Sequence, residues 1–239
     1  MIATLSLGQS GLMNAGRSPF WSRVVLAVDC QGADGATTFV DRTGRHTVAA
    51  SGNAQIDTGD SDFPTGAVLL DGVSDYLAVT GNTGDFNYGT DDVTIECWSK
   101  HSSFASAENF LVGNYSGGGS AGVQLYINGS GGAGASLAVR KGDSIVESRT
   151  FSLATNTLHH AAFVRRAGTC RLFSQGSKLG ADISTMSGSL GTSAAVGIGS
   201  GYPTYPTLFE TTGWIQWVRI TKDSIYWDDF TPVRPARYI

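Results

Sequence analysis

Alternation of apolar and polar side chains with a period of two is the feature that most constrains this sequence. It is clear in residues 93–99, 125–127, 136–140 and 213–220, and clusters of Gly, Asn, Asp or Ser bound these segments. A period of two puts successive side chains on opposite faces of a β-strand, and turn residues between such runs are typical of antiparallel sheets. Similar short runs supply further candidate strands at residues 24–29, 46–50, 67–70, 75–79, 109–113, 143–149, 158–166, 169–174 and 195–199.

So many short strands, spaced at roughly 8–12 residues, predict an all-β protein built as a sandwich or barrel. Hydrophobic residues make up 41% of the 239 residues, which is enough for a substantial core. The modest helix candidate is residues 222–227, which Thr231 and Pro232 would close.

Residues 1–23 differ from the rest because they are polar, contain Gly and Ser, and show no periodicity. We interpret them as an N-terminal arm, and residues 24–239, which show no shift in composition, as one domain. An extended arm gains buried area and hydrogen bonds by lying on a neighbouring subunit, so we expect this one to serve in anchoring and assembly. The apolar residues expected to make those contacts are Leu5, Leu7, Leu12, Met13, Phe20 and Trp21.

Charge and composition exclude several functional classes. A net charge of −4 argues against a nucleic-acid-binding protein, which normally carries a basic surface. No apolar run approaches the ~20 residues of a membrane span, and the first residues lack the basic segment of a signal peptide. Cys30, Cys97 and Cys170 are odd in number, so we expect free, buried thiols in a protein made in a reducing cytoplasm.

A series of short motifs follows in order from residue 41. They lie at residues 41–48 (DRTGRHTV), 52–56 (GNAQI), 63–67 (FPTGA), 70–77 (LDGVSDYL), 85–90 (DFNYGT), 94–98 (TIECW), 158–162 (LHHAA), 171–173 (RLF), 213–222 (GWIQWVRITK) and 230–232 (FTP). In this order they resemble the concanavalin A-like, laminin-G-type domain common in structural proteins of tailed bacteriophages. The resemblance covers most of residues 24–239, and it implies a jelly-roll sandwich of two curved antiparallel sheets.

Two positions depart from that pattern. Relatives often carry an acidic pair where this chain has Gln216 and Trp217, and an Asp there can help to hold calcium. A neutral amide is a poorer calcium ligand than a carboxylate, so we expect no metal site of this kind and no cofactor. Leu158 stands where relatives tend to have Trp, which removes a core aromatic side chain.

Catalytic chemistry finds little support in the residues present. Glycoside hydrolysis needs two carboxylates across the scissile bond, and none of the four glutamates, Glu96, Glu108, Glu147 and Glu210, has an acidic partner two residues further on. Adjacent strand residues such as His159 and His160 point to opposite faces, so they cannot hold one ion together, and we expect packed, hydrogen-bonded histidines. The sequence therefore predicts a protein that is not an enzyme.

The remaining candidates for ligand contact are loop aromatics. Residues 201–209 form a loop that carries Tyr202, Tyr205 and Phe209. Tyr is favoured in recognition loops because it offers a broad contact area with few rotatable bonds. These side chains either bind a partner or pack back onto the sandwich.

A second candidate contact lies in residues 213–220. Val218 and Ile220 mark one face as the inner one, so strict alternation predicts that Ile215 and Trp217 point away from the core and form a contact surface. The alternative is that the C-terminal tail, through Tyr226 or Tyr238, folds back over Trp217.

Together these features indicate a non-enzymatic structural protein of a bacteriophage virion. We expect it to be made in the host cytoplasm, to contact other virion proteins and to form a homo-oligomer within the particle. We expect it neither to bind nucleic acid nor to insert into a membrane. A tail position with adhesion to a host-surface glycan or protein is favoured over decoration of the capsid. A carbohydrate-active hydrolase is the third possibility.

Overall fold

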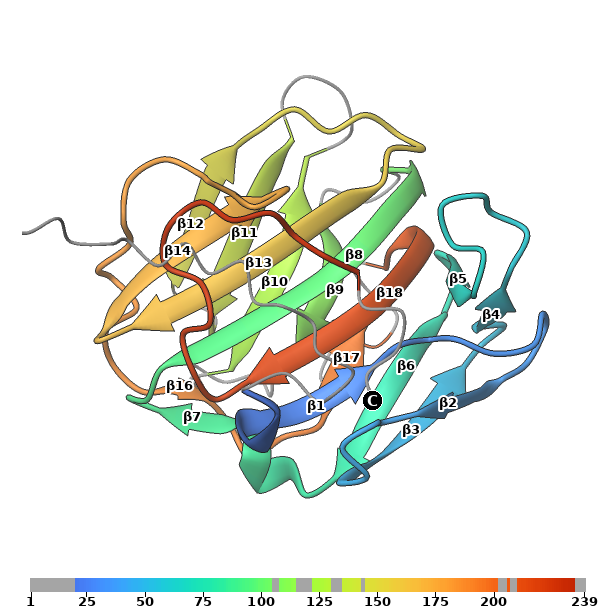
Figure 1. The fold of residues 1–239 in the computed structure, drawn as a ribbon, viewed down its shortest axis with the longest axis horizontal. Coiled ribbons are helices and arrows are strands. Elements are labelled where there is room, and N and C mark those ends of the chain that lie inside the picture. Colours follow the sequence, from blue (N-terminus) through green and yellow to red (C-terminus); the bar gives the residue numbers. More distant parts are fainter. Residues whose placement is uncertain are drawn as a thin grey trace, which may run out of the picture.

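The computed structural model describes residues 20–104, 108–114, 122–129, 135–142, 145–201, 206 and 210–234, and their fold is a sandwich of two eight-stranded antiparallel sheets (Figure 1). Sheet A contains, in order, β15 (Ser177–Lys178), β14 (Thr169–Ser174), β13 (His159–Arg166), β8 (Val93–Ser103), β18 (Thr212–Thr221), β5 (Ala67–Asp71) and β4 (Gln55–Asp57), and β1 (Val24–Val28) also pairs with β18. Sheet B contains β12 (Ile145–Thr150), β11 (Ser136–Lys141), β10 (Val123–Asn128), β9 (Glu108–Gly113), β17 (Val196–Ile198), β6 (Tyr76–Gly81), β3 (His46–Ser51) and β2 (Thr38–Val40).

Every strand predicted from alternation is present, and β8 continues beyond its predicted end to Ser103. The prediction missed β2, β4, β15 and the small pair β7 (Asn87–Gly89) and β16 (Leu190–Gly191). These strands have only two or three residues, too few to show a period of two. The all-β class and the jelly-roll sandwich are therefore confirmed.

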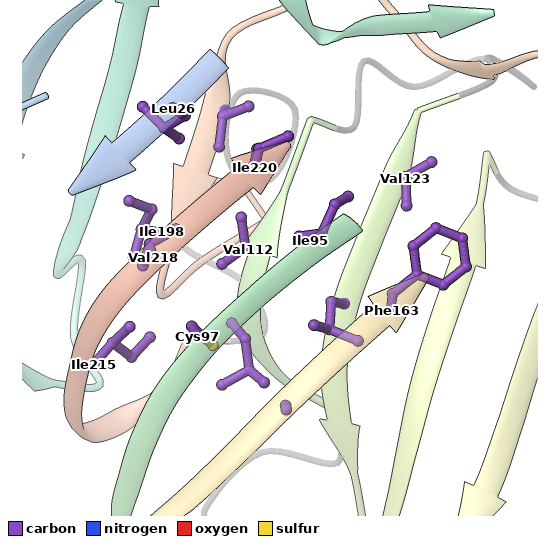
Figure 2. Close-up of a cluster of buried hydrophobic side chains, with 14 of the residues drawn as sticks. Leu26, Ile95, Cys97, Val112, Val123, Phe163, Ile198, Ile215, Val218 and Ile220 are labelled. Atoms are coloured by element: carbon purple, nitrogen blue, oxygen red, sulfur yellow. The ribbon is translucent and has the colours of Figure 1, made fainter. Parts of the chain in front are cut away.

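The core lies between the two sheets, where Figure 2 shows side chains from both. Those labelled there are Leu26, Ile95, Cys97, Phe163, Ile215, Val218 and Ile220 from sheet A, and Val112, Val123 and Ile198 from sheet B. All belong to one buried cluster. Cys30, Cys97 and Cys170 are buried free thiols.

The helix predicted for residues 222–227 is wrong. In the described chain, helical structure consists of two short 3-10 turns, η1 (Trp21–Arg23) and η2 (Thr83–Phe86). The backbone of residues 222–227 bonds to sheet A instead of to itself, because the Thr94 hydroxyl donates to the Asp223 carbonyl at 2.8 Å and accepts from the Ile225 amide at 3.2 Å. The described residues include no helix with the length and apolarity that a membrane span requires.

The outward orientation predicted for Ile215 is also wrong, because a β-bulge interrupts β18. Gln216 faces Trp98 and Arg219 faces Glu96 on β8, so three steps along β18 match two along β8. The extra residue falls at Trp217, whose φ is +55°. Alternation restarts after the bulge, and Ile215 joins Val218 in the core. Trp217 is only 3% exposed, so the predicted exposed pair does not exist.

The C-terminal segment, residues 222–234, lies on the outer face of sheet A and crosses β13 and β8 (Figure 1). Tyr226, Trp227 and Phe230 pack against buried residues of β13 and β14 there. The C-terminal segment thus returns onto sheet A, but Tyr226 packs on residues of β13 and β14 and bonds to Arg219, so the predicted cover of Trp217 by Tyr226 stays a prediction, and Tyr238 lies outside the described residues.

Candidate functional site

A shallow charged groove lies where the chain before β1, the turn before β3, η2 and the end of β18 meet. It consists of two adjoining hollows of about 440 and 360 Å³ that share Arg45 and Asp85. The first is lined by Gly44, Arg45, Asn82, Gly84 and Asp85, and the second by Ser22, Arg23, Val25, Arg45, Asp85 and Lys222.

The Arg45–Asp85 ion pair spans the centre of this groove. Nε of Arg45 donates to Oδ2 of Asp85 at 2.6 Å, and Nη2 donates to Oδ1 at 2.5 Å. The hydrogen bonds from Arg45 hold the pKa of the Asp85 carboxyl below its usual value, so Asp85 is ionised at neutral pH. Asn82 fixes the neighbouring backbone, since its Nδ2 donates to the Arg45 carbonyl at 2.9 Å. The guanidinium plane of Arg45 is therefore set before any ligand arrives.

A buried carboxylate holds the turn beneath the groove. Asp41 accepts hydrogen bonds from the amides of Ala27, Thr43, Arg45 and His46, and from the Thr43 hydroxyl. Burial opposes its ionisation, yet these bonds and the contact with His46 lower the pKa of Asp41 below its usual value. The first motif of the sequence is thus a rigid structural turn.

His46 connects this turn to the groove. Its side chain is fully buried; its Nδ1 lies 2.9 Å from Oδ2 of Asp41 and its Nε2 lies 3.5 Å from Oδ2 of Asp85. The imidazole also stacks on Phe86 of η2, with 4.7 Å between ring centroids. The packed side chain of His46 therefore helps to fix the position of Asp85.

At the surface of the groove, cationic side chains outnumber carboxylates. Arg23 is 62% exposed and its Nη1 lies 3.3 Å from Oδ2 of Asp223. Lys222 lines the second hollow and forms no ion pair with any described residue. At the surface of the groove Arg23, Arg45 and Lys222 therefore lie beside two carboxylates, Asp85 and Asp223, while a third, Asp41, is buried beneath the turn. Such an arrangement can bind an anionic group.

The structure places the predicted contact residues in three situations. Tyr202, Tyr205, Phe209, Leu5, Leu7, Leu12 and Met13 lie outside the described residues. Phe20 and Trp21 are half-buried and immediately precede the groove residues Ser22 and Arg23. Ile215 and Trp217 are buried. The sequence prediction missed Arg23, Arg45, Asp85 and Lys222 as site residues, although the last three lie within the motifs at residues 41–48, 85–90 and 213–222.

The two adjacent histidines lie on opposite faces of β13, as predicted. Nε2 of His159 lies 2.9 Å from the Ser174 hydroxyl, and Nε2 of His160 lies 3.1 Å from Oε2 of Glu96. Burial disfavours an ionised Glu96, but Arg219 and His160 outweigh it and hold the pKa of Glu96 at about 2. A carboxyl group with that pKa stays ionised at neutral pH and cannot act as a general acid.

Three aspartates close together in the sequence, Asp57, Asp60 and Asp62, have structural partners. Asp60 and Asp62 both accept from Nζ of Lys100, at 2.7 and 2.8 Å, and Asp57 accepts from Nε1 of Trp214 at 2.6 Å. Across the described ranges, no three His, Cys, Asp or Glu side chains are placed to hold a metal ion.

Comparison with solved structures shows the same fold in receptor-binding domains of toxins. The binding domain of botulinum neurotoxin serotype D/C superposes with a TM-score of 0.63 at 13% identity, covering 86% of this chain and 50% of that chain. The binding domain of Paraclostridial Mosquitocidal Protein 1 gives 0.61 at 13% identity, with the same coverage. A botulinum neurotoxin type C structure, described by its dependence on two ganglioside molecules for cell entry, gives 0.58 at 12% identity, covering 86% of this chain and 49% of that chain.

The chain thus spans about half the length of the solved domains it matches, and at these identities the likeness concerns the fold alone. No curated protein sequence matches it significantly. The family model Laminin_G_3, described as the Concanavalin A-like lectin/glucanases superfamily, matches residues 71–229. That span runs from the end of β5 through β18 into the C-terminal segment, so most of both sheets is included. By its fold and its sequence alike, the chain belongs to the concanavalin A-like lectin/glucanase superfamily.

Proposed function

We propose that this protein is a non-enzymatic binding module of a tailed-bacteriophage particle, and that it attaches the particle to a glycan on the host surface. The observation that carries the proposal is the charged groove, since it is a concave site built on rigid turns of a sandwich. The superfamily includes lectins by its own description. One structural neighbour is described as interacting with gangliosides, which are cell-surface glycolipids.

The phage context rests on the order of the motifs between residues 41 and 232, which resembles that of tailed-phage structural proteins. Absence of catalysis is favoured by Glu96, because this buried glutamate is committed to an ion network with Arg219 and His160. A tail position accords with adhesion better than a position on the capsid does.

A glycan array probed with the labelled protein tests the binding function. We expect selective binding to a subset of surface saccharides, without turnover of the bound glycans. Absence of binding both to the array and to host cells would reject the proposal, and release of shortened saccharides would replace it with a hydrolase.

The arm and the location need a separate experiment on particles. Deleting residues 1–20 should leave a folded domain that no longer joins the virion, because those residues are proposed to anchor it. Immunogold labelling of intact particles should mark the tail. Labelling confined to the head would favour capsid decoration instead.

A further inference from the structure

We infer that the groove binds the carboxylate of an acidic saccharide, with Arg23, Arg45 and Lys222 as its cationic contacts. The inference rests on the proposed glycan-binding function and adds the chemical class of the ligand. Three separate segments supply these cations: η1, the turn before β3, and the residue after β18. Their convergence depends on the tertiary fold and not on a local run of basic residues.

The charges around the groove favour a ligand with a single negative charge. Asp85 and Asp223 lie among the three cations, and the buried carboxylate of Asp41 lies beneath the turn. The positive charge open to a ligand is therefore confined to the side chains of Arg23, Arg45 and Lys222. A carboxylate on a sugar can pair with these cations, whereas a polyphosphate or nucleic acid would also meet the neighbouring carboxylates and a chain with a net charge of −4. Asp85 and Asp223 can accept hydrogen bonds from sugar hydroxyl groups.

Arg45 is preorganised for this role. Asp85 occupies its Nε and Nη2 groups, so the guanidinium is held in one plane while the side chain remains 47% exposed. The Nη1 edge makes no bond with any described residue and remains available to a ligand. A guanidinium fixed beforehand loses less conformational entropy on binding than a free one.

The groove also has room for a sugar. Its hollows of about 440 and 360 Å³ lie within the ~300–1,000 Å³ range of small-ligand sites. Gly84 forms part of the wall, and a Cβ added there would meet no atom within 4 Å. A side chain at this position would therefore project into open space, and its φ is not in the left-handed region.

Isothermal titration with two acidic probes tests the inference. The probes are sialyllactose and tetragalacturonate, and their neutral counterparts are lactose and carboxyl-reduced tetragalacturonate. We expect at least one acidic probe to bind roughly tenfold or more tightly than its counterpart, and its affinity to fall with added salt, as screening requires. Sodium acetate at the same concentration serves as the free-anion control.

Two variants locate the site. Gly84→Trp should weaken binding of the acidic probe, because it adds a bulky side chain at the wall of the groove. Lys222→Glu should weaken binding roughly tenfold or more, and Lys178→Glu, which changes the same charge on β15, should not. Circular dichroism should show all three variants folded.

Three results would overturn the inference. If neutral saccharides bind as tightly as acidic ones, the protein does not recognise the carboxylate, although the proposed glycan binding would stand. Acidic binding unchanged by both Gly84→Trp and Lys222→Glu would place the ligand elsewhere on the protein. Acetate that competes as well as the saccharide would make the groove a general anion site. Failure of all saccharides, on the array as well, would instead reject the proposed function itself.

Discussion

Two clusters in this molecule combine the same three residue types, an arginine, a carboxylate and a histidine. Arg219, Glu96 and His160 lie on the outer face of sheet A, with side chains 15%, 6% and 3% exposed. Arg45, Asp85 and His46 lie at the groove, where the arginine is 47% exposed and Asp85 13%. The chemistry of the two sets is similar, but their access to solvent is not.

The C-terminal segment makes this difference. Tyr226 stacks on Phe230 at 3.6 Å between ring centroids, and Phe230 contacts the edge of His160 at 5.8 Å. The hydroxyl of Tyr226 also accepts a hydrogen bond from Nη2 of Arg219 at 3.0 Å. The first cluster is thereby sealed and contributes to stability, while the second keeps a cation available to a ligand. Burial by a distant segment, and not residue type, separates a structural ion network from a candidate binding site.

The largest expected effect follows from breaking the sealed cluster. Arg219→Met leaves the buried Glu96 without its arginine, and loss of one partner from a buried ion pair typically costs about 3–5 kcal/mol. Urea unfolding should show this loss in the free energy of unfolding. The double variant Glu96→Gln/Arg219→Met should recover part of it, and a loss below about 1 kcal/mol in the single variant would contradict the sealed character of the cluster.

Acid should weaken the same cluster. The folded-state pKa of Glu96 is about 2, below its ordinary value of 4.5, so its stabilising contribution is complete above pH 4.5 and is lost as pH falls towards 2. Glu96→Gln lacks this titration. The stability difference between the native protein and this variant should therefore shrink by on the order of 2 kcal/mol between about pH 7 and pH 3. A difference that stays constant would show that Glu96 is not held ionised.

Truncating a side chain of the C-terminal segment that covers this cluster should have a smaller effect on stability. Phe230→Ala removes the ring that packs on Tyr226, His160 and Phe173, and because this ring is only partly buried we expect a loss of about 1–2 kcal/mol. Thermal unfolding measures the loss. Saccharide binding at the groove should not change, and a parallel loss of binding would mean that the two clusters are coupled.

The smallest effect on stability is expected at the groove. Arg45→Met removes a solvent-exposed ion pair, which typically contributes less than about 1 kcal/mol. Binding of an acidic saccharide should nevertheless fall roughly tenfold or more. A stability loss comparable to that of Arg219→Met would remove the distinction between the two clusters.

Local sequence patterns predicted much of this fold. Alternation located β8 and placed His159 and His160 on opposite faces, because the direction of a strand side chain depends only on its position in the pleat. The same rule failed at Ile215, because the bulge at Trp217 depends on the pairing of β18 with β8 and leaves no local signature. The helix expected at residues 222–227 failed because Thr94, more than a hundred positions away, binds their backbone.

The sequence by itself determined the class of the protein: an all-β sandwich, the faces of its regular strands, and motifs in the order typical of one superfamily. These properties depend on short-range alternation and on turn residues. Only the tertiary structure decided which charged residues meet, because Arg23, Arg45, Asp85 and Lys222 approach one another through the pairing of β1 with β18 and of β3 with β6. Likewise, only the docking of residues 222–234 decided that Glu96 is buried and Asp85 borders an open groove, since burial depends on segments that are remote along the chain.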